Sequence, residues 1–223
     1  EYLKKKKSAS LLAIQISYYA GLRIGEVAGL SWNDVNLEEQ HLTIRRSLNS
    51  NSTRHKLELG ATKSNKVRIV DFGDTLAEIL RKEKKEQLKQ RLQYGELYKR
   101  NYYKEVKEKN RIHYELYSLD GTQEVPEDYK EISLVCVRKD GMYLGTDALS
   151  NMCSSIAKHV EGLEHFHFHL LRHTFTSNLL ASGAPPKDVQ ELLGHSAVST
   201  TMNIYAHATR EAKRNSVRLL DKV

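Results

Sequence analysis

A chain of 223 residues with 39% hydrophobic and 28% charged residues has the composition of a globular protein, which excludes a disordered one. Lys and Arg total 35 against 28 Asp and Glu, and the net charge of +7 favours a polyanionic partner, nucleic acid before an anionic membrane. The sequence has no apolar run of the roughly 18 residues that a membrane span needs, and its 2 cysteines, in neither a CxxC nor a disulfide-rich context, indicate a reducing cytoplasm.

The N-terminal third predicts two helices followed by strands. Residues 8–21 carry apolar side chains at helical spacing, and we expect this helix to end at Gly21. Residues 23–32 predict a second, short helix. Residues 41–48 alternate apolar and polar side chains as a strand does, and residues 55–72 predict two more strands folded around the turn-forming letters TKSNK. Together these segments predict a small antiparallel sheet against a helical body.

The middle of the chain has a different character. Residues 74–117 are charged, rich in tyrosine and largely helical in pattern. We therefore expect residues 84–130 to form a charged, Tyr-rich helical insertion whose Tyr and Leu face packs on the domain. The alternative is that this basic, aromatic face touches DNA or a partner subunit.

The last third predicts mostly helix. A helix of residues 169–182 would be closed by Gly183, and the next would begin at the proline pair of PPKDVQELLGH and end at Gly194. We expect one domain of residues 1–223, mainly α-helical with a small antiparallel β-sheet. Because the sequence does not begin with Met, we also expect it to be a fragment of a longer protein.

Five separate segments carry polar side chains that each have an ordinary explanation when taken alone. An Arg and a Glu one turn apart form a common surface ion pair, and lysines are frequent on turns. A His at a helix end interacts well with the helix dipole, and a lone Tyr is often half-buried. The side chains concerned are Arg23 with Glu26, Lys63, His169 with Arg172, His195, and Tyr205.

A metal site is the first alternative for the histidines. His169 and His173 are four residues apart and could bind one metal from the same helix face. However, Leu170 stands where a zinc protease has Glu, and Arg172 between the two histidines would repel a cation. The sequence places no Cys or acidic residue nearby to complete a site. We therefore expect neither a metal nor another cofactor.

The order of the segments is more informative than any one of them. GLRIGE, TKSNK, HLLRH, LGHS and the tyrosine of MNIYAHAT follow one another along the chain. This order resembles the tyrosine recombinases, or phage-integrase family, and most of all the integrases of conjugative transposons. The resemblance covers most of the chain, with residues 84–130 poorly matched. It implies the family's catalytic-domain fold and an enzyme that breaks and rejoins DNA strands through a 3′-phosphotyrosine, without metal or ATP, to integrate and excise a mobile element.

The resemblance also implies a role for each side chain. Tyr205 would be the nucleophile that attacks the scissile phosphodiester. Arg23 and Arg172 would clamp its non-bridging oxygens, because guanidinium is planar, permanently charged and bidentate. Lys63 would give a proton to the leaving 5′-oxygen, and His169 would be the acid–base group near the tyrosine.

Other residues are expected to support these. His195 would hydrogen-bond the phosphate, Glu26 would orient Arg23, and His173 would be structural. Lys66 is the fallback for the proton donor. The candidate DNA contacts are Arg45, Lys66 and Arg68.

The resemblance implies double-stranded DNA as the partner, in the cytoplasm of a bacterium and away from membranes. It further implies N-terminal DNA-binding domains ahead of this chain and a tetramer on DNA in which C-terminal segments are exchanged between protomers. Two other functions stay open at this point. One is a relaxing enzyme similar to type IB topoisomerases, which would use the same side chains; the other is a DNA-binding module without activity.

Overall fold

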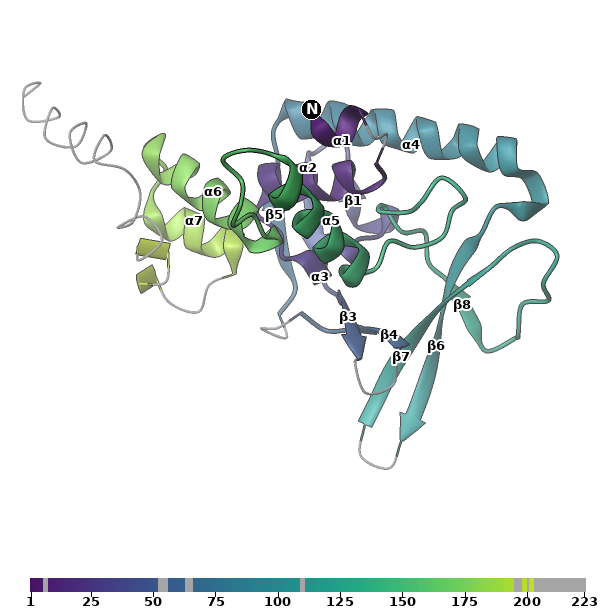
Figure 1. Ribbon diagram of the computed structural model, residues 1–223. Helices are drawn as coiled ribbons and strands as arrows, with labels where there is room; N and C mark the ends of the chain where they lie inside the picture. The colour runs from purple at the N-terminus through teal and green to yellow at the C-terminus, as the bar shows by residue number, and fades with distance from the viewer. Residues whose placement is uncertain are drawn as a thin grey trace, which may run out of the picture.

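The computed structural model of the chain describes residues 1–5, 8–51, 56–62, 66–108, 111–194, 198–199 and 201–202. Helices contribute more of these residues than strands do, and all strand pairs are antiparallel. Figure 1 shows the helices gathered around short strands at the centre, with a longer pair of strands leaving the body. The predicted mainly α architecture with antiparallel strands is confirmed.

The N-terminal helices form as their sequence predicts. In α2 the buried side chains Leu12, Ile16 and Ala20 recur every fourth residue, so one face of the helix enters the core. The helix ends at Gly21, which has a φ of +66° and donates its N–H to the carbonyl of Ser17. The elements of this part are α1 (Tyr2–Lys5), α2 (Ser10–Ala20), α3 (Ile24–Ala28) and the 3-10 turn η1 (Trp32–Asp34).

The described strands form two sheets. The first has the order β1-β2-β5 and the second the order β3-β4-β7-β6-β8. The members of the first are β1 (Val35–Asn36), β2 (His41–Ile44) and β5 (Arg68–Asp71). The members of the second are β3 (Ser47–Asn51), β4 (Lys56–Gly60), β6 (Arg100–Glu108), β7 (Arg111–Leu119) and β8 (Tyr129–Glu131).

The strands on either side of the TKSNK turn do not pair with each other as the sequence predicted. Among the described strands, β4 pairs with β3 and β7, whereas β5 pairs with β2 in the other sheet. The register places Leu42 opposite Val70, and both side chains are fully buried. Burying this pair against the helices determines which strand β5 joins.

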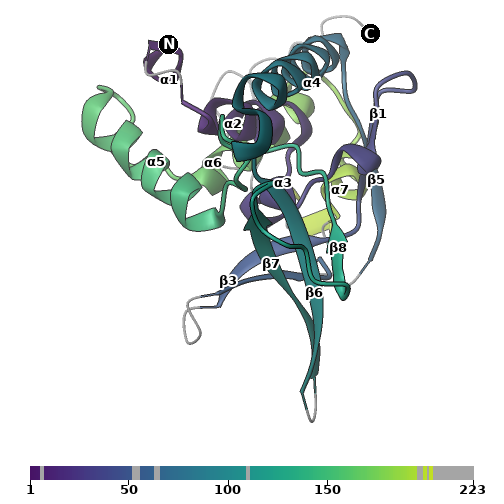
Figure 2. The same cartoon turned by 90° about the vertical axis from the view of Figure 1, so that its right-hand side faces the viewer.

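The expected helical insertion of residues 84–130 is wrong for most of its length. Helix α4 (Asp74–Tyr94) ends at Tyr94 and is followed by the 3-10 turn η2 (Gly95–Leu97) and then by β6, β7 and β8. These strands contain the aromatic and β-branched residues that favour strands, and the register sets Tyr102 opposite Tyr117 and Lys104 opposite Glu115. Figure 2 shows β6 and β7 extending as an arm away from the helices.

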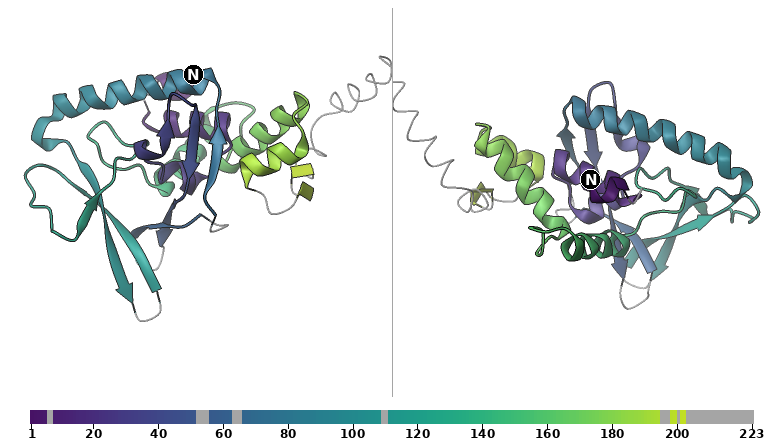
Figure 3. Two further views of the ribbon diagram at one scale, coloured as in Figure 1. Left: turned by 180° about the vertical axis from the view of Figure 1, so that it is seen from behind. Right: turned by 45° about the horizontal axis from the view of Figure 1, so that its top comes forward.

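The C-terminal helices are α5 (Thr146–His159), α6 (Phe168–Ala181) and α7 (Pro186–Leu193). The bounds of α6 and α7 agree with the prediction within two residues at each end. Both views of Figure 3 place α6 and α7 at the end of the molecule away from the β6–β7 arm. Within the described ranges, the helices are too short or too polar to span a bilayer.

Candidate active site

Arg172 projects from α6 into the interior of the protein and is only 1% exposed. Its Nη1 donates to the carbonyl of Gly21 at 2.7 Å, and its Nη2 donates to the carbonyl of Leu193 at 2.6 Å. These carbonyls lie at the C-terminal ends of α2 and α7, where helix dipoles place partial negative charge. The buried Nε has no hydrogen-bond acceptor among the described residues. Because buried donors are nearly always paired, this N–H is available to a ligand oxygen.

Gly21 allows the close approach of three helices at this point. A Cβ on Gly21 would lie 2.5 Å from Cδ1 of Phe175 in α6 and 2.9 Å from Cδ2 of Leu193 in α7. The positive φ of this residue is also one that side-chain-bearing residues rarely adopt. The glycine therefore brings the end of α2 against α6 and α7, and places Arg23 two residues beyond the carbonyl that Arg172 binds.

Arg23 and Glu26 form the beginning of α3. The backbone N–H of Arg23 donates to Oε2 of Glu26 at 2.9 Å, which caps the helix, and its Nη1 donates to Oε1 at 3.1 Å. The carboxylate of Glu26 is buried, whereas the side chain of Arg23 is partly exposed. The buried carboxylate of Glu26 therefore fixes the position of the Arg23 guanidinium at the surface.

Arg68 approaches the same carboxylate from β5. Its Nη1 and Nη2 donate to Oε1 and Oε2 of Glu26 at 2.9 and 2.7 Å, and its Nε donates to the carbonyl of Leu192 at 3.1 Å. Burial alone would raise the pKa of Glu26, but the hydrogen bonds and charges of Arg68 and Arg23 outweigh burial and lower it. Glu26 is therefore a carboxylate between two guanidiniums at neutral pH.

His169 and His173 stand next to each other on α6. Their rings are 4.6 Å apart between centroids and nearly perpendicular. Partial burial, and then the charges of His173, Arg172 and Arg23, lower the pKa of His169 to about 4. Burial, His167 and Arg172 likewise lower the pKa of His173. A neutral imidazole can accept a proton at pH 7, so His169 has the protonation state of a general base.

The cluster carries more positive than negative charge. Burial, and then the charges of Arg23 and Arg68, lower the pKa of Arg172 to about 9, while Glu26 opposes them. Arg172 therefore keeps its charge at pH 7. Three guanidiniums around one carboxylate leave an excess of positive charge beside a buried, unused N–H, which is an environment suited to an anion.

The structure brings several of the predicted residues together. Arg23, Glu26 and Arg172 meet between the ends of α2, α3 and α7, and His169 lies one turn before Arg172 on α6. The charge of Arg23 helps to lower the pKa of both Arg172 and His169. The predicted Lys63, His195 and Tyr205 lie outside the described residues.

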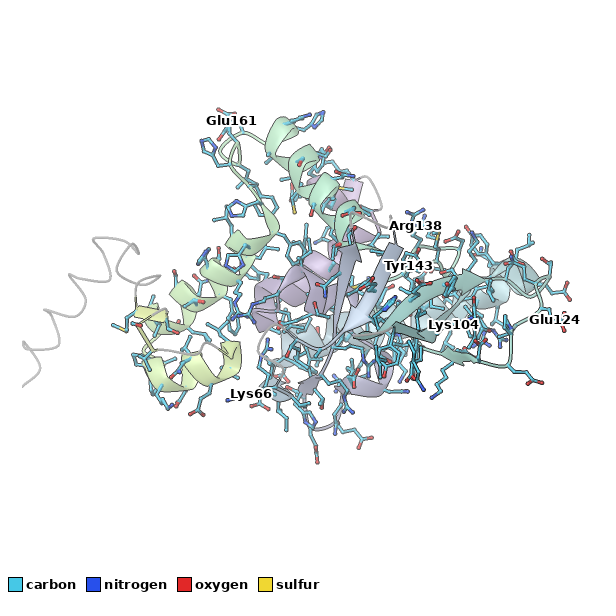
Figure 4. All side chains as sticks on the ribbon, turned by 90° about the horizontal axis from the view of Figure 1, so that it is seen from below. Lys66, Lys104, Glu124, Arg138, Tyr143 and Glu161 are labelled. Carbon is cyan, nitrogen blue, oxygen red and sulfur yellow. The ribbon has the colours of Figure 1, made fainter. Side chains whose placement is uncertain are left out.

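The predicted DNA contacts have different surroundings. Arg45 and Arg46 both pair with the buried carboxylate of Asp34, at 2.8 and 3.0 Å. Lys66 is exposed, and Figure 4 places it toward α7, whereas Lys104 lies on the β6–β7 arm. The side chain of Arg68 is 10% exposed and all three of its guanidinium nitrogens already donate to protein atoms.

Sequence reasoning missed the structural role of Arg68. Strand alternation puts Arg68 on the same side as Val70, but the sequence alone does not show that this side is buried, because Val67 and Ile69 lie on the other side. An arginine on the inward side of a strand needs a buried acceptor, and Glu26 is the carboxylate that meets it.

The fold and the cluster define a mainly helical protein with a partly buried arginine cluster suited to an anion. The chain belongs to the phage integrase family, whose model matches residues 1–212. A tyrosine recombinase XerC-like protein of Caldanaerobacter subterraneus subsp. tengcongensis is 26% identical to it, over 92% of this chain and 47% of the relative. Tyrosine recombinase XerC of Pediococcus pentosaceus is 29% identical, over 96% of this chain and 54% of the relative.

A solved structure shows the same fold. The Tn1549 transposon integrase, solved in complex with transposon right end DNA, superposes with a TM-score of 0.65 at 22% identity. The match covers 95% of this chain and 59% of the integrase chain. The chain spans about half the length of the curated relatives it matches.

Proposed function

We propose that the chain is the catalytic domain of a site-specific DNA recombinase that integrates and excises a mobile element. The buried Arg172 gives the strongest support, because its Nε–H lacks an acceptor among the described residues. It lies in a net positive cluster with Arg23. This arrangement suits a phosphate, and membership of the phage integrase family makes a DNA phosphodiester the natural substrate. The transposon integrase and its DNA complex support the mobile-element assignment.

The reaction would proceed through a covalent enzyme–DNA intermediate. The phenol oxygen of Tyr205 attacks the scissile phosphorus, the bond to the 5′-oxygen breaks, and a 3′-phosphotyrosine forms. The phenol proton passes to a base, for which neutral His169 is suited, and Lys63 protonates the leaving 5′-oxygen. The reverse attack by a 5′-hydroxyl of another strand rejoins the DNA. Because each step exchanges one phosphodiester for another, no ATP is consumed.

The two arginines would stabilise the pentacoordinate transition state. Arg23 is partly exposed and Arg172 is buried, so they can hold two oxygens of one phosphate from the surface and from the inside. Their charge is in place before the substrate arrives, and preorganised charge of this kind is usually the largest catalytic contribution. His195 would add a hydrogen bond to the same phosphate.

The partner would be double-stranded DNA, bound mainly through its phosphates by a chain with a net charge of +7. Arg45 and Lys66 are the remaining candidate contacts. Recombination between two sites requires four active protomers, so we propose a tetramer on DNA with exchange of C-terminal segments. A DNA substrate supports a location where DNA is accessible, and we propose the cytoplasm of a bacterium.

Covalent trapping tests the proposal. A library of nicked duplexes cut from the DNA that flanks the gene is incubated with the protein, and adducts that survive denaturation are captured and sequenced. A nick near the cleavage point lets the short 5′-end diffuse away, so the adduct accumulates. We expect adducts on one family of sequences and none with Tyr205→Phe. Failure of the unmodified protein to form any adduct would overturn the proposal, and plasmid relaxation without two-site exchange would indicate a topoisomerase-like enzyme.

A further inference from the structure

Arg68 connects three elements that are far apart in the sequence. It belongs to β5, it binds both carboxylate oxygens of Glu26 in α3, and it binds the carbonyl of Leu192 in the last turn of α7. A guanidinium can satisfy these acceptors together because its donors form a rigid planar fork. With its side chain 10% exposed, Arg68 has little surface left for DNA.

The aliphatic part of Arg68 also packs against the end of α7. A Cβ on Gly194 would lie 3.0 Å from Cδ of Arg68, so the glycine lets the two approach closely. Gly194 has a φ of +65° and terminates α7 directly before His195. Arg68 therefore holds the last residues of α7 by both polar and apolar contacts.

Arg172 holds the neighbouring carbonyl. Its Nη2 binds Leu193, so two successive carbonyls at the end of α7 are each bound by an arginine from a different element. The same two arginines are linked through Glu26, which Arg68 binds directly and whose charge acts on Arg172. A shift of α7 would therefore change both the carboxylate that orients Arg23 and the guanidinium of Arg172.

We propose that Arg68 is a positioning residue that fixes the end of α7 relative to the Arg23–Arg172 pair. This inference rests on the proposed function for its effect on catalysis, but the anchoring of α7 is independent of it. Arg68 acts through Glu26 and Leu192 and does not contact the phosphate. Its loss should therefore slow the chemical step more than it weakens DNA binding, since a displacement of about 1 Å can cost on the order of 10²-fold in rate.

The test compares Arg68→Gln and Arg68→Lys with a matched control. Arg46→Gln also removes one of two arginines from a buried carboxylate, here Asp34, and leaves Arg45 in place. Hydrogen exchange of the α7 amides is measured for each variant without DNA. The rate of adduct formation at saturating duplex, and the dissociation constant of that duplex, are measured with the nicked sequence that the trapping screen yields.

For Arg68→Gln we expect faster exchange in the last turn of α7, a fall of at least tenfold in the rate of adduct formation, and less than a threefold change in the dissociation constant. Arg68→Lys should keep the fold and the affinity but not the slow exchange, because the compact ammonium lacks the planar fork that reaches both oxygens of Glu26 and the carbonyl of Leu192 at once. Arg46→Gln should leave α7 exchange and the rate within twofold of the unmodified protein.

Unchanged exchange of α7 in Arg68→Gln would overturn the inference, whether or not the protein cleaves DNA. A large loss of affinity with a lower salt dependence and an unchanged rate would also overturn it, because that result marks a direct phosphate contact. If the unmodified protein forms no adduct, the proposed function fails, and the exchange experiment alone decides the role of Arg68.

Discussion

The guanidinium of Arg68 binds both carboxylate oxygens of Glu26, at 2.9 and 2.7 Å, across 42 residues of sequence. Arg23 binds the same carboxylate from within its own helix. Glu26 is thus the shared anchor of one arginine that faces the surface and one that holds the end of α7. The charge balance at this carboxylate should govern both the stability of the domain and the geometry of its active site.

Glu26→Gln should destabilise the protein by about 3 kcal/mol at pH 7, because it leaves a buried guanidinium without its anionic partner. The difference in the free energy of unfolding between Glu26→Gln and the unmodified protein should depend on pH. The pKa of Glu26 is lowered from 4.5 in the folded state, so its stabilisation is complete above pH 4.5 and is lost as pH falls through the lowered value. Urea unfolding from neutral to acid pH checks this, and a difference that stays constant or grows on acidification would contradict it.

Gly21→Ala should destabilise the protein more than its unfavourable φ alone would. Strain at a positive φ costs about 1 to 2 kcal/mol, and the added methyl would also meet Phe175 at 2.5 Å and Leu193 at 2.9 Å. Gly162→Ala is the matched control, since Gly162 has a φ of +80° and, among the described residues, no heavy atom within 4 Å of an added Cβ. Urea unfolding should show a loss at least about 2 kcal/mol larger for Gly21→Ala; equal losses would show that α2 does not pack on α6 and α7 in this way.

The pKa of His169 should lie well below its ordinary value of 6.5, near the value of about 4 that its surroundings favour. His173→Phe keeps an aromatic ring at the neighbouring position but removes the second-largest cause of the shift, and should raise the pKa of His169. Titration of the imidazole resonances by NMR checks both statements. A pKa of 6.5 or higher in the unmodified protein would contradict the assignment of a neutral base.

The rate of adduct formation should depend on the protonation state of His169. If neutral His169 accepts the phenol proton, the contribution of His169 to the rate is constant above its pKa and falls about tenfold per pH unit below it. His169→Gln should remove this dependence while lowering the rate at neutral pH on the order of 10²-fold. Single-turnover rates across the pH range provide the comparison, and a rate that increases as the pH falls below the pKa of His169 would exclude the base role.

Arg23→Lys should lower the rate of adduct formation on the order of 10²-fold with little change in stability. Lysine keeps the charge but lacks the planar pair of donors that stabilises the pentacoordinate phosphate of the transition state. Arg81→Lys serves as a control, because Arg81 is an exposed arginine that binds the carbonyl of Leu37, away from the cluster. Unfolding curves that coincide with the unmodified protein show that the loss is catalytic, and a rate within threefold of the unmodified protein would remove Arg23 from the clamp.

The sequence predicted those elements whose ends are marked by residues with special backbone properties. Gly21 ends α2 in the left-handed conformation, and proline and Gly194 mark the two ends of α7. The meeting of Arg23, Glu26 and Arg172 was predictable only from the resemblance to the tyrosine recombinases, because the two arginines are 149 residues apart in the chain. Helical spacing indicates contacts only between residues that are close in sequence.

Two features could not be predicted, for different reasons. The run that forms β6 and β7 has many Lys, Glu and Tyr residues, which are compatible with a solvated helix. It forms strands by pairing β6 with β7 and, through β7, with the distant β4. At β5 hydrophobicity alone favours the wrong face, since Ile69 and the preceding Val67 are 58% and 65% exposed while Arg68 is inside. The orientation of this strand is set by the buried Glu26, which the local sequence does not contain.

The proposed active site requires Arg23 and Arg172 to hold one phosphate between them, and a crystal structure of the chain on its nicked duplex would show whether they do. We expect Nε of Arg172 and a terminal nitrogen of Arg23 to lie within hydrogen-bonding distance, about 3 Å, of two oxygens on the same phosphorus. Arginines bound to two different phosphates, or an Arg172 that still binds Gly21 and Leu193 with its Nε turned away from the DNA, would contradict the account.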